Sequence, residues 1–434
     1  TASENTAVGV NALLTNTTGA ANTASGYLAL TANTTGSSNA AFGKDSLGAN
    51  TTGNANVAVG KDALKANTTA DNNTAVGIDA LTANTTGHSN VAIGANALLT
   101  STTRLGNTAV GFNAAKVTDT TGIVAVGYKA MEANTTGYDA VAVGASSLLA
   151  NTTGHSNTAV GFSALAANTT GADNTAVGNS ALLANTTGTR NTVVGVDSSN
   201  QITSGSDNTA MGFDALTRCT TGVSNTCIGK DAGDNITNGG YNTCLGIDSG
   251  TNITQGSAHV MVGDSTTASA ENSQNEIVIG VGIAGVGSNS FTFGKASNRV
   301  SNDFDTNASW TRSSDINKKT NIENTDLGLS FINELRPVTF NWKSNNEFPT
   351  HFKDYSETEN HMDTETNLYG MIAQDVEKAL DKVGHKNFGG WSEQEDGSQM
   401  LAQSMFIYPL INAVKELSTT VDELKQELSA LKGE

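Results

Sequence analysis

The sequence predicts a mainly β protein: a long parallel β-roll, or solenoid, followed by a small α+β domain that ends in a long coiled-coil helix. Three observations support this prediction. A glycine returns at nearly constant spacing over the first two thirds of the chain. Each of these glycines follows a short apolar run of the kind that forms strands. Residues 407–431 carry apolar side chains at heptad spacing.

The repeat has the consensus N-T-A-V-G-x-x-A-L-x-A-N-T-T-G-x-x and fills residues 1–295. Seventeen glycines define sixteen intervals, of which fifteen are 17 residues long and one is 16 residues long. A fixed period of this length is typical of repeat proteins, and about seventeen rungs are therefore expected. The glycines are Gly9, Gly26, Gly43, Gly60, Gly77, Gly94, Gly111, Gly127, Gly144, Gly161, Gly178, Gly195, Gly212, Gly229, Gly246, Gly263 and Gly280.

Each repeat is expected to form one rung, with a short strand and tight corners. The residue before the glycine is apolar in nearly every copy, and the fourth residue after it is usually leucine. We expect both to lie inside, so that each rung contributes one branched aliphatic, one leucine and small residues to a narrow core. The glycine would supply a corner with positive φ. At a strand spacing of ~4.8 Å, the rungs would make a rod on the order of 80 Å long.

So thin an interior favours association of several chains around a shared axis. The repeats resemble the heads of trimeric adhesins, in which S/N-x-A-I/V-G motifs stack as a left-handed parallel β-roll. This resemblance covers about two thirds of the chain, and it implies that three rolls pack side by side in a homotrimer. The 17-residue period is longer than the shortest form of that repeat.

Charge and composition exclude several classes of partner. The net charge of −18 divides into −8 for residues 1–313 (12 basic, 20 acidic) and −10 for residues 314–434 (11 basic, 21 acidic). Neither part has the basic patch that nucleic acid or anionic lipid requires. There is no apolar run long enough for a membrane span and no signal peptide. Because the chain starts at Thr1 without a methionine, we expect this start to be a fragment edge or a processed end, and the attachment module of a fibre would lie upstream of it.

No cofactor or metal site is expected, since the sequence has no phosphate loop, zinc spacing or calcium nonapeptide. His88 and His155 occupy equivalent positions four rungs apart, too far to share a metal, and should be solvated. Cys227 and Cys244 fall at the same position of adjacent repeats and should stack as small apolar fillers rather than as a disulfide.

The Asn and Thr residues of the corners allow more than one interpretation. The N-T-T triplets match the glycosylation sequon, but Asn and Thr ladders at the corners require the same residues, and we favour ladders. Ice binding by threonine is disfavoured, because the threonines lie beside glycine and not as T-x-T on a flat strand.

The region after the repeats reads as a polar connector, 296–313, and an ordinary globular domain, 314–434. In this domain, 326–335 has helical periodicity up to Pro337, 338–343 alternates like a strand, and 344–367 reads as an exposed loop. Residues 368–381 read as a strand that continues into a helix. The heptad predicts a coiled coil; the alternative is one amphipathic helix docked on its own domain. Its apolar residues are Ile407, Leu410, Val414, Leu417, Val421, Leu424, Leu428 and Leu431.

Four motifs in order connect this domain with a known family: S-D-I-N-K-K-T-N-I, L-G-L-S-F-I-N-E-L-R-P-V-T-F-N-W-K, Y-G-M-I-A-Q-D-V and P-L-I-N-A-V-K-E-L. Together they resemble the intramolecular chaperone domain of phage tail fibres and tailspikes, the S74 peptidase family. The resemblance implies a trimeric C-terminal domain that aligns three chains, assists the folding of the fibre and then cleaves itself off.

The same resemblance implies that Ser314 is a nucleophile, that Lys319 is its base and that the Ser313–Ser314 bond is cleaved. Lysine can accept a proton only when it is neutral, so its pKa must fall through burial or nearby positive charge, to which Lys318 could contribute. Asp315 and Asn321 fix the register of the motif. Asn317 and Lys318 stand where the family usually has Arg and Leu. The five-residue spacing separates the two side chains on a strand or helix, so we hypothesise that they meet across a bend or between chains.

We therefore predict a homotrimeric phage tail fibre that attaches to a host-surface receptor, a glycan or a surface protein. It would be made in the host cytoplasm, sit on the virion tail and cleave only itself. The alternative is a non-cleaving structural or adhesive trimeric fibre of bacterial origin whose C-terminal domain only trimerises. No constellation of residues supports an enzyme that acts on external substrates.

Overall fold

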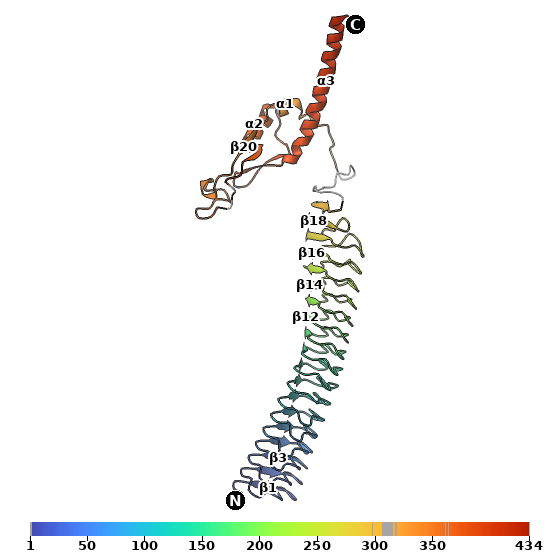
Figure 1. The fold of residues 1–434 in the computed structure, drawn as a ribbon, viewed down its shortest axis with the longest axis vertical. Coiled ribbons are helices and arrows are strands. Elements are labelled where there is room, and N and C mark those ends of the chain that lie inside the picture. The colour runs from blue at the N-terminus through green and yellow to red at the C-terminus, as the bar shows by residue number, and fades with distance from the viewer. Residues whose placement is uncertain are drawn as a thin grey trace. The chain divides into compact units, whose positions relative to one another are not determined.

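A computed structural model describes residues 2–296, 298–305, 316, 319–360, 362 and 364–433. The chain divides into two compact units, Thr1–Ser313 and Ser314–Glu434. The first is a parallel β-solenoid and the second contains short strands and helices, ending in one long helix (Figure 1). The predicted mainly β fold class is thus confirmed.

The solenoid is built from one strand per repeat, and each strand pairs in parallel with the strand one repeat later. Equivalent residues lie side by side, as in the pairing of Thr158 with Thr175. The strands are β1 (Thr6–Val8), β2 (Thr23–Ser25), β3 (Ala40–Phe42), β4 (Val57–Val59), β5 (Thr74–Val76), β6 (Val91–Ile93), β7 (Thr108–Val110), β8 (Val124–Val126), β9 (Val141–Val143), β10 (Thr158–Val160), β11 (Thr175–Val177), β12 (Thr192–Val194), β13 (Thr209–Met211), β14 (Thr226–Ile228), β15 (Thr243–Leu245), β16 (Val260–Val262) and β17 (Ile277–Val281).

The repeat glycines make the corner that follows each strand. All seventeen have φ between 120° and 154°, a region that residues with a Cβ rarely adopt. Their neighbours leave no room for a side chain either, because a Cβ on Gly161 would overlap the carbonyl group of Gly178 in the next rung. The predicted role of the glycines is therefore confirmed.

The interior is narrower than we expected. Alanine two positions before the glycine and leucine four positions after it are fully buried, as Ala159 and Leu165 show. The residue before the glycine points outward instead; Val59 is 37% exposed and Leu245 is 45% exposed. The prediction of a branched aliphatic in each rung's core was wrong, because side chains alternate along a strand and the central alanine takes the inward position.

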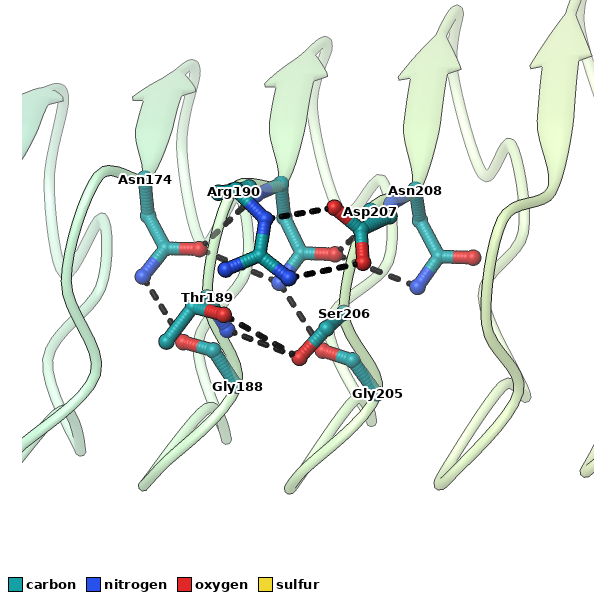
Figure 2. A network of polar contacts seen from close by, with 9 residues as sticks. Asn174, Gly188, Thr189, Arg190, Gly205, Ser206, Asp207 and Asn208 are labelled. Atoms are coloured by element: carbon teal, nitrogen blue, oxygen red, sulfur yellow. Dashed lines mark hydrogen bonds and ion pairs between the residues drawn. The ribbon is translucent and has the colours of Figure 1, made fainter.

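Two columns of buried asparagine join the rungs. In the first, four positions before the glycine, the Asn191 side-chain oxygen accepts the backbone N–H of Asn208 (3.0 Å), whose side-chain amide donates to the Gly222 carbonyl (2.9 Å). Figure 2 shows this column around Asn174 and Asn208, beside the ion pair of Arg190 with Asp207 in the next rung (Nε–Oδ1 2.6 Å).

The second column consists of the asparagines of the N-T-T-G corners. Asn168 is fully buried and donates to the Asn151 side-chain oxygen (2.8 Å) and to the Gly171 carbonyl (2.9 Å). These contacts support the ladder interpretation of the N-T-T triplets rather than the sequon interpretation, since a buried, bonded amide is not open to glycosylation.

Three cysteines lie in the core, and the structure leaves all of them as free thiols. Cys227 and Cys244 face each other across neighbouring strands, as expected of apolar fillers. In these two rungs, glycine replaces the usual leucine; a Cβ on Gly233 would overlap the Cys227 sulfur. In the same two rungs, Ile236 and Ile253 replace the corner asparagine. The isoleucine side chains thus make up for the apolar volume that the missing leucines would have filled.

The solenoid ends in a hairpin. Strand β18 (Ser290–Lys295) still pairs in parallel with β17, and the predicted shortened last unit around Gly294 is present. Strand β19 (Asn298–Asp303) then pairs antiparallel with β18. Residues 298–303, expected in the polar connector, therefore extend the sheet.

The second unit contains two small antiparallel ladders and an aromatic core. Strand β20 (Pro337–Phe340) pairs with β21 (Leu368–Met371), and β22 (Trp391–Glu393) pairs with β23 (Gln399–Leu401). The helical elements are α1 (Leu329–Ile332), η2 (Asn345–Glu347), α2 (Ala373–Lys382), η3 (Gln403–Phe406) and α3 (Ile407–Lys432).

The core of this unit contains Leu327, Phe331, Val376, Ala379, Leu380 and Phe406. The long C-terminal helix and the strand-to-helix passage at 368–381 match the prediction. The helix expected at 326–335 is a single turn, and the β22–β23 hairpin was not foreseen.

Candidate functional site

The predicted dyad falls only partly within the described residues. Ser313, Ser314, Asp315 and Lys318 lie outside them. Lys319 is exposed, and its backbone N–H donates to the Ile316 carbonyl (3.2 Å). The pairing of Ser314 with Lys319 therefore stays a prediction. The boundary between the two compact units falls between Ser313 and Ser314.

Asn321, two residues beyond Lys319, adopts a left-handed backbone conformation with φ of 51°. Asparagine tolerates this conformation better than most residues with a Cβ. The chain thus turns directly after the predicted base, a feature that the sequence motif alone did not reveal.

The segment 325–329, which follows the motif, is attached to helix α3. The Asn412 side-chain amide donates to the carbonyls of Thr325 (3.2 Å) and Leu327 (3.3 Å). The Glu416 carboxylate accepts the backbone N–H of Leu329 at 2.7 Å and the Asn412 amide at 3.2 Å. From here on, these contacts are called the α3 clamp.

A third contact holds the same segment from another side. His385, just beyond helix α2, lies 3.0 Å from the Asp326 carboxylate through its Nε2 atom. Leu327 meanwhile packs into the aromatic core. Residues 325–329 are therefore fixed by side chains that lie some 60 to 90 positions further along the chain. No local spacing of residues indicates these partners.

Helix α3 packs one face against its own domain, and another face is exposed. Pro409 and Ala413 are its buried residues. The heptad residues, in contrast, are 41–85% exposed along the whole helix. The alternative prediction of a docked helix thus holds only for the first turns, and the heptad seam takes no part in that docking.

An apolar hollow of about 370 Å³ continues this seam onto the domain. The heptad residues Ile407 and Leu410 line it together with Pro337, Met371 and Phe406. A neighbouring hollow of about 590 Å³ shares Met371 and extends to Trp342. Exposed apolar surface of this continuity is characteristic of association sites.

The solenoid also carries an exposed apolar stripe, which follows the outward side chains of the strands and, in most rungs, the residue after the glycine; Lys44, Lys61 and Lys230 are among the polar exceptions. Its aromatic members include Phe112 and Tyr128, whose rings stack at 5.6 Å in adjacent rungs. Large side chains on it that are more than a third exposed are Val8, Val10, Tyr27, Phe42, Val57, Val59, Ile78, Ile93, Phe112, Tyr128, Val143, Phe162, Val196, Met211, Phe213, Leu245, Ile247, Ile279, Val281 and Phe293.

The histidines differ from one another in environment. His88 is exposed, as predicted, whereas His155 is half-buried against Tyr138 (ring centroids 4.9 Å apart). His259, not singled out from the sequence, is fully buried at a position where most earlier rungs have asparagine. Its Nδ1 accepts the backbone N–H of Glu276 (3.3 Å) and its Nε2 donates to the Ser273 carbonyl (2.8 Å). Burial lowers the pKa of the His259 imidazole. The broken asparagine column was the signal that could have identified it.

Comparison with known proteins gives one family match. Residues 314–385 match the model of the peptidase S74 family, described as a chaperone of endosialidase, and the match begins at Ser314. No curated protein sequence matches the chain. Among the helices that the structure describes, none has the length and apolar composition to cross a membrane.

Proposed function

We propose that the chain is a homotrimeric phage tail fibre whose C-terminal unit chaperones trimer folding and then cleaves the Ser313–Ser314 bond. The observation that carries this proposal is the position of the family match. It starts at Ser314, the residue at which the second compact unit also starts. A chaperone-type domain thus directly follows a long repetitive rod, the kind of chain that needs help to align.

The proposed reaction requires only groups of this chain. Neutral Lys319 takes the proton from the Ser314 Oγ, which attacks the carbonyl carbon of Ser313. The C–N bond breaks, the Ser314 nitrogen receives the proton, and an ester links Ser313 to the Ser314 oxygen. Water then hydrolyses this ester and separates shaft from chaperone. Each chain would react once, without a cofactor.

Two surfaces support assembly of identical chains: the open heptad seam of α3 and the apolar stripe of the solenoid. The seam has Ile407, Val414, Val421 and Leu428 at one set of positions and leucine throughout at the other. In isolated coiled coils this pattern favours two strands, so three chains are inferred from the family and adhesin resemblances and from the solenoid stripe. The measured mass of the assembled particle distinguishes two chains from three.

Attachment to a host surface rests on the resemblance to fibres. The receptor would be a glycan or a surface protein, and the fibre would be part of the virion tail, joined through a module upstream of the repeats. Binding of the purified fibre to host cells, with loss of binding after removal of surface glycans or proteins, tests this part separately.

The decisive experiment is denaturing electrophoresis with intact mass on the full chain, beside Ser314→Ala and Lys319→Ala. We expect a cut between Ser313 and Ser314 in the wild type and full-length chains in both variants. Analytical ultracentrifugation of the same samples should give three chains per particle. A full-length wild type that is trimeric would replace this proposal with the non-cleaving structural fibre.

A further inference from the structure

The segment that follows the proposed cleavage motif is bound by a helix from the opposite end of the domain's sequence. Thr325, Leu327 and Leu329 begin only six residues beyond Lys319, yet their backbone groups are bound by Asn412 and Glu416. These two side chains lie on the first turns of α3, beside the start of the heptad seam. The helix proposed to join the chains therefore also holds the segment that leads out of the cleavage motif.

The contact between Glu416 and the segment depends on a particular glycine. A Cβ on Gly328 would overlap the Glu416 carboxylate. Gly328 precedes α1 with φ of −142° and ψ of −137°, and it has no side chain that would block the Glu416 carboxylate. Its role is thus to let a charged side chain of α3 reach the backbone. Hydrogen bonds to an ionised acceptor are stronger than neutral ones, which suits a contact that must hold position.

The geometry of the clamp separates it from the association surface. Asn412 and Glu416 are not heptad residues, and they bind within their own chain. Removing them leaves the exposed seam from Leu410 to Leu431 unchanged. The clamp can therefore be removed by substitution without altering the association surface.

We propose that Asn412 and Glu416 are positioning residues for the autocleavage: they fix the chain after Lys319 to α3, so that association of the helices orders the Ser314–Lys319 motif. This inference rests on the proposed function. The physical reason is that a long helix supported only at its first turns frays along the rest of its length, whereas the same helix locked in a coiled coil gives the clamp a rigid base. Catalysis by a dyad is sensitive to displacements of about 1 Å, which can cost about 100-fold in rate.

The test measures the rate of cleavage in full-length chains made by cell-free synthesis, counted only in the trimer fraction. We expect Asn412→Ala and Glu416→Ala to form trimers and to cleave at least about tenfold more slowly. Glu416→Gln should recover much of the rate, because its side-chain oxygen can still accept the Leu329 N–H. Glu423→Ala, at the same heptad position one repeat later, is the matched control and should cleave like the wild type.

Gly328→Ala disrupts the same contact from the opposite side and keeps α3 intact. It should slow cleavage as Glu416→Ala does, even if the helix substitution impairs assembly. Thermal unfolding of each trimer distinguishes positioning from loss of structure: the rate should fall in variants whose unfolding midpoint stays within a few degrees of the wild type.

Trimers of Glu416→Ala and Gly328→Ala that cleave at the wild-type rate would overturn the inference and leave the proposed function standing. Rates that fall only in proportion to lost stability, with no recovery in Glu416→Gln, would also overturn it. A wild-type chain that never cleaves is a different result, because it removes the proposed reaction itself.

Discussion

The two units of this chain form their hydrophobic cores in different ways. The solenoid repeats one solution: alanine and leucine inside, two asparagine columns, and contacts to rungs one repeat away. The C-terminal unit gathers Phe331 and Phe406 from distant parts of the sequence around a single core. Contacts in the rod are equivalent from rung to rung, so a rung can pair in a wrong register, whereas the C-terminal core has one arrangement. The difference explains why a rod of this kind benefits from an attached domain that fixes the starting point.

The largest effect is expected from the open seam of α3. Replacing Leu417 and Leu424 together by Asp places charges inside the proposed coiled coil and should abolish assembly. Because the clamp then lacks its rigid base, cleavage should stop as well. Sedimentation and electrophoresis of the same sample check both. Gln426→Asp, on the outer face of the helix, is the control, and assembled Leu417→Asp/Leu424→Asp chains would contradict the role of the seam.

The second effect compares the inside and outside of one rung. Leu165→Ala empties a fully buried site and should cost about 2–5 kcal/mol of unfolding free energy. Val160→Ala, in the same rung but partly exposed, should cost less than about 1.5 kcal/mol in a separate chain. Chemical denaturation of shaft fragments measures both. A Val160→Ala cost that grows upon trimer formation would indicate that the apolar stripe is buried between chains.

The third effect concerns the asparagine column shown in Figure 2. Asn191→Ala leaves the Asn208 backbone N–H and the Gly205 carbonyl without their side-chain partner in a buried position. Each buried group left unpaired costs about 1–3 kcal/mol. Exchange of the Asn208 amide with solvent should accelerate more than that of amides four rungs away. Equal acceleration along the whole rod would show that the column does not act locally.

The smallest effect is a dependence on pH at the end of the rod. The His259 pKa is lower in the folded chain than its ordinary value near 6.5, so the unfolded chain binds the proton more tightly. Stability should therefore fall as the pH drops below about 6.5, and it should stop falling below the folded-state pKa. His259→Asn restores the residue of the earlier rungs. The difference in unfolding free energy between wild type and variant, measured from pH 8 to pH 5, should be constant above about pH 6.5 and change below it if the imidazole is responsible.

Most of the fold could be predicted from the sequence, because the constant spacing of the glycines gives the period of the repeat, the position of its corners and the register of its strands. The direction of side chains did not follow, since Val at the strand end is more hydrophobic than Ala at its centre and suggested the wrong face. In the C-terminal unit, the strand-to-helix passage and the long helix were predictable from local patterns. The clamp was not, because Asn412 and Glu416 bind backbone groups 85 to 87 residues away and leave no local pattern.

The dyad residues could be named from the motif, but their geometry could not. A five-residue spacing does not say whether Ser314 and Lys319 would meet across a bend in one chain or between two chains. Asn321, with its left-handed backbone, shows that a turn follows Lys319 directly.

The one short interval of the repeat has a consequence for the length of the rod. Between Gly111 and Gly127 a residue is missing at the corner, yet Thr108 still pairs with Val124 and the following strands keep their alignment. A rung can therefore lose part of its corner, or be gained and lost as a whole, without disturbing its neighbours. The length of the solenoid can therefore change in steps of ~4.8 Å, the spacing of one rung. The number of repeats in the sequence thus sets the length of the solenoid.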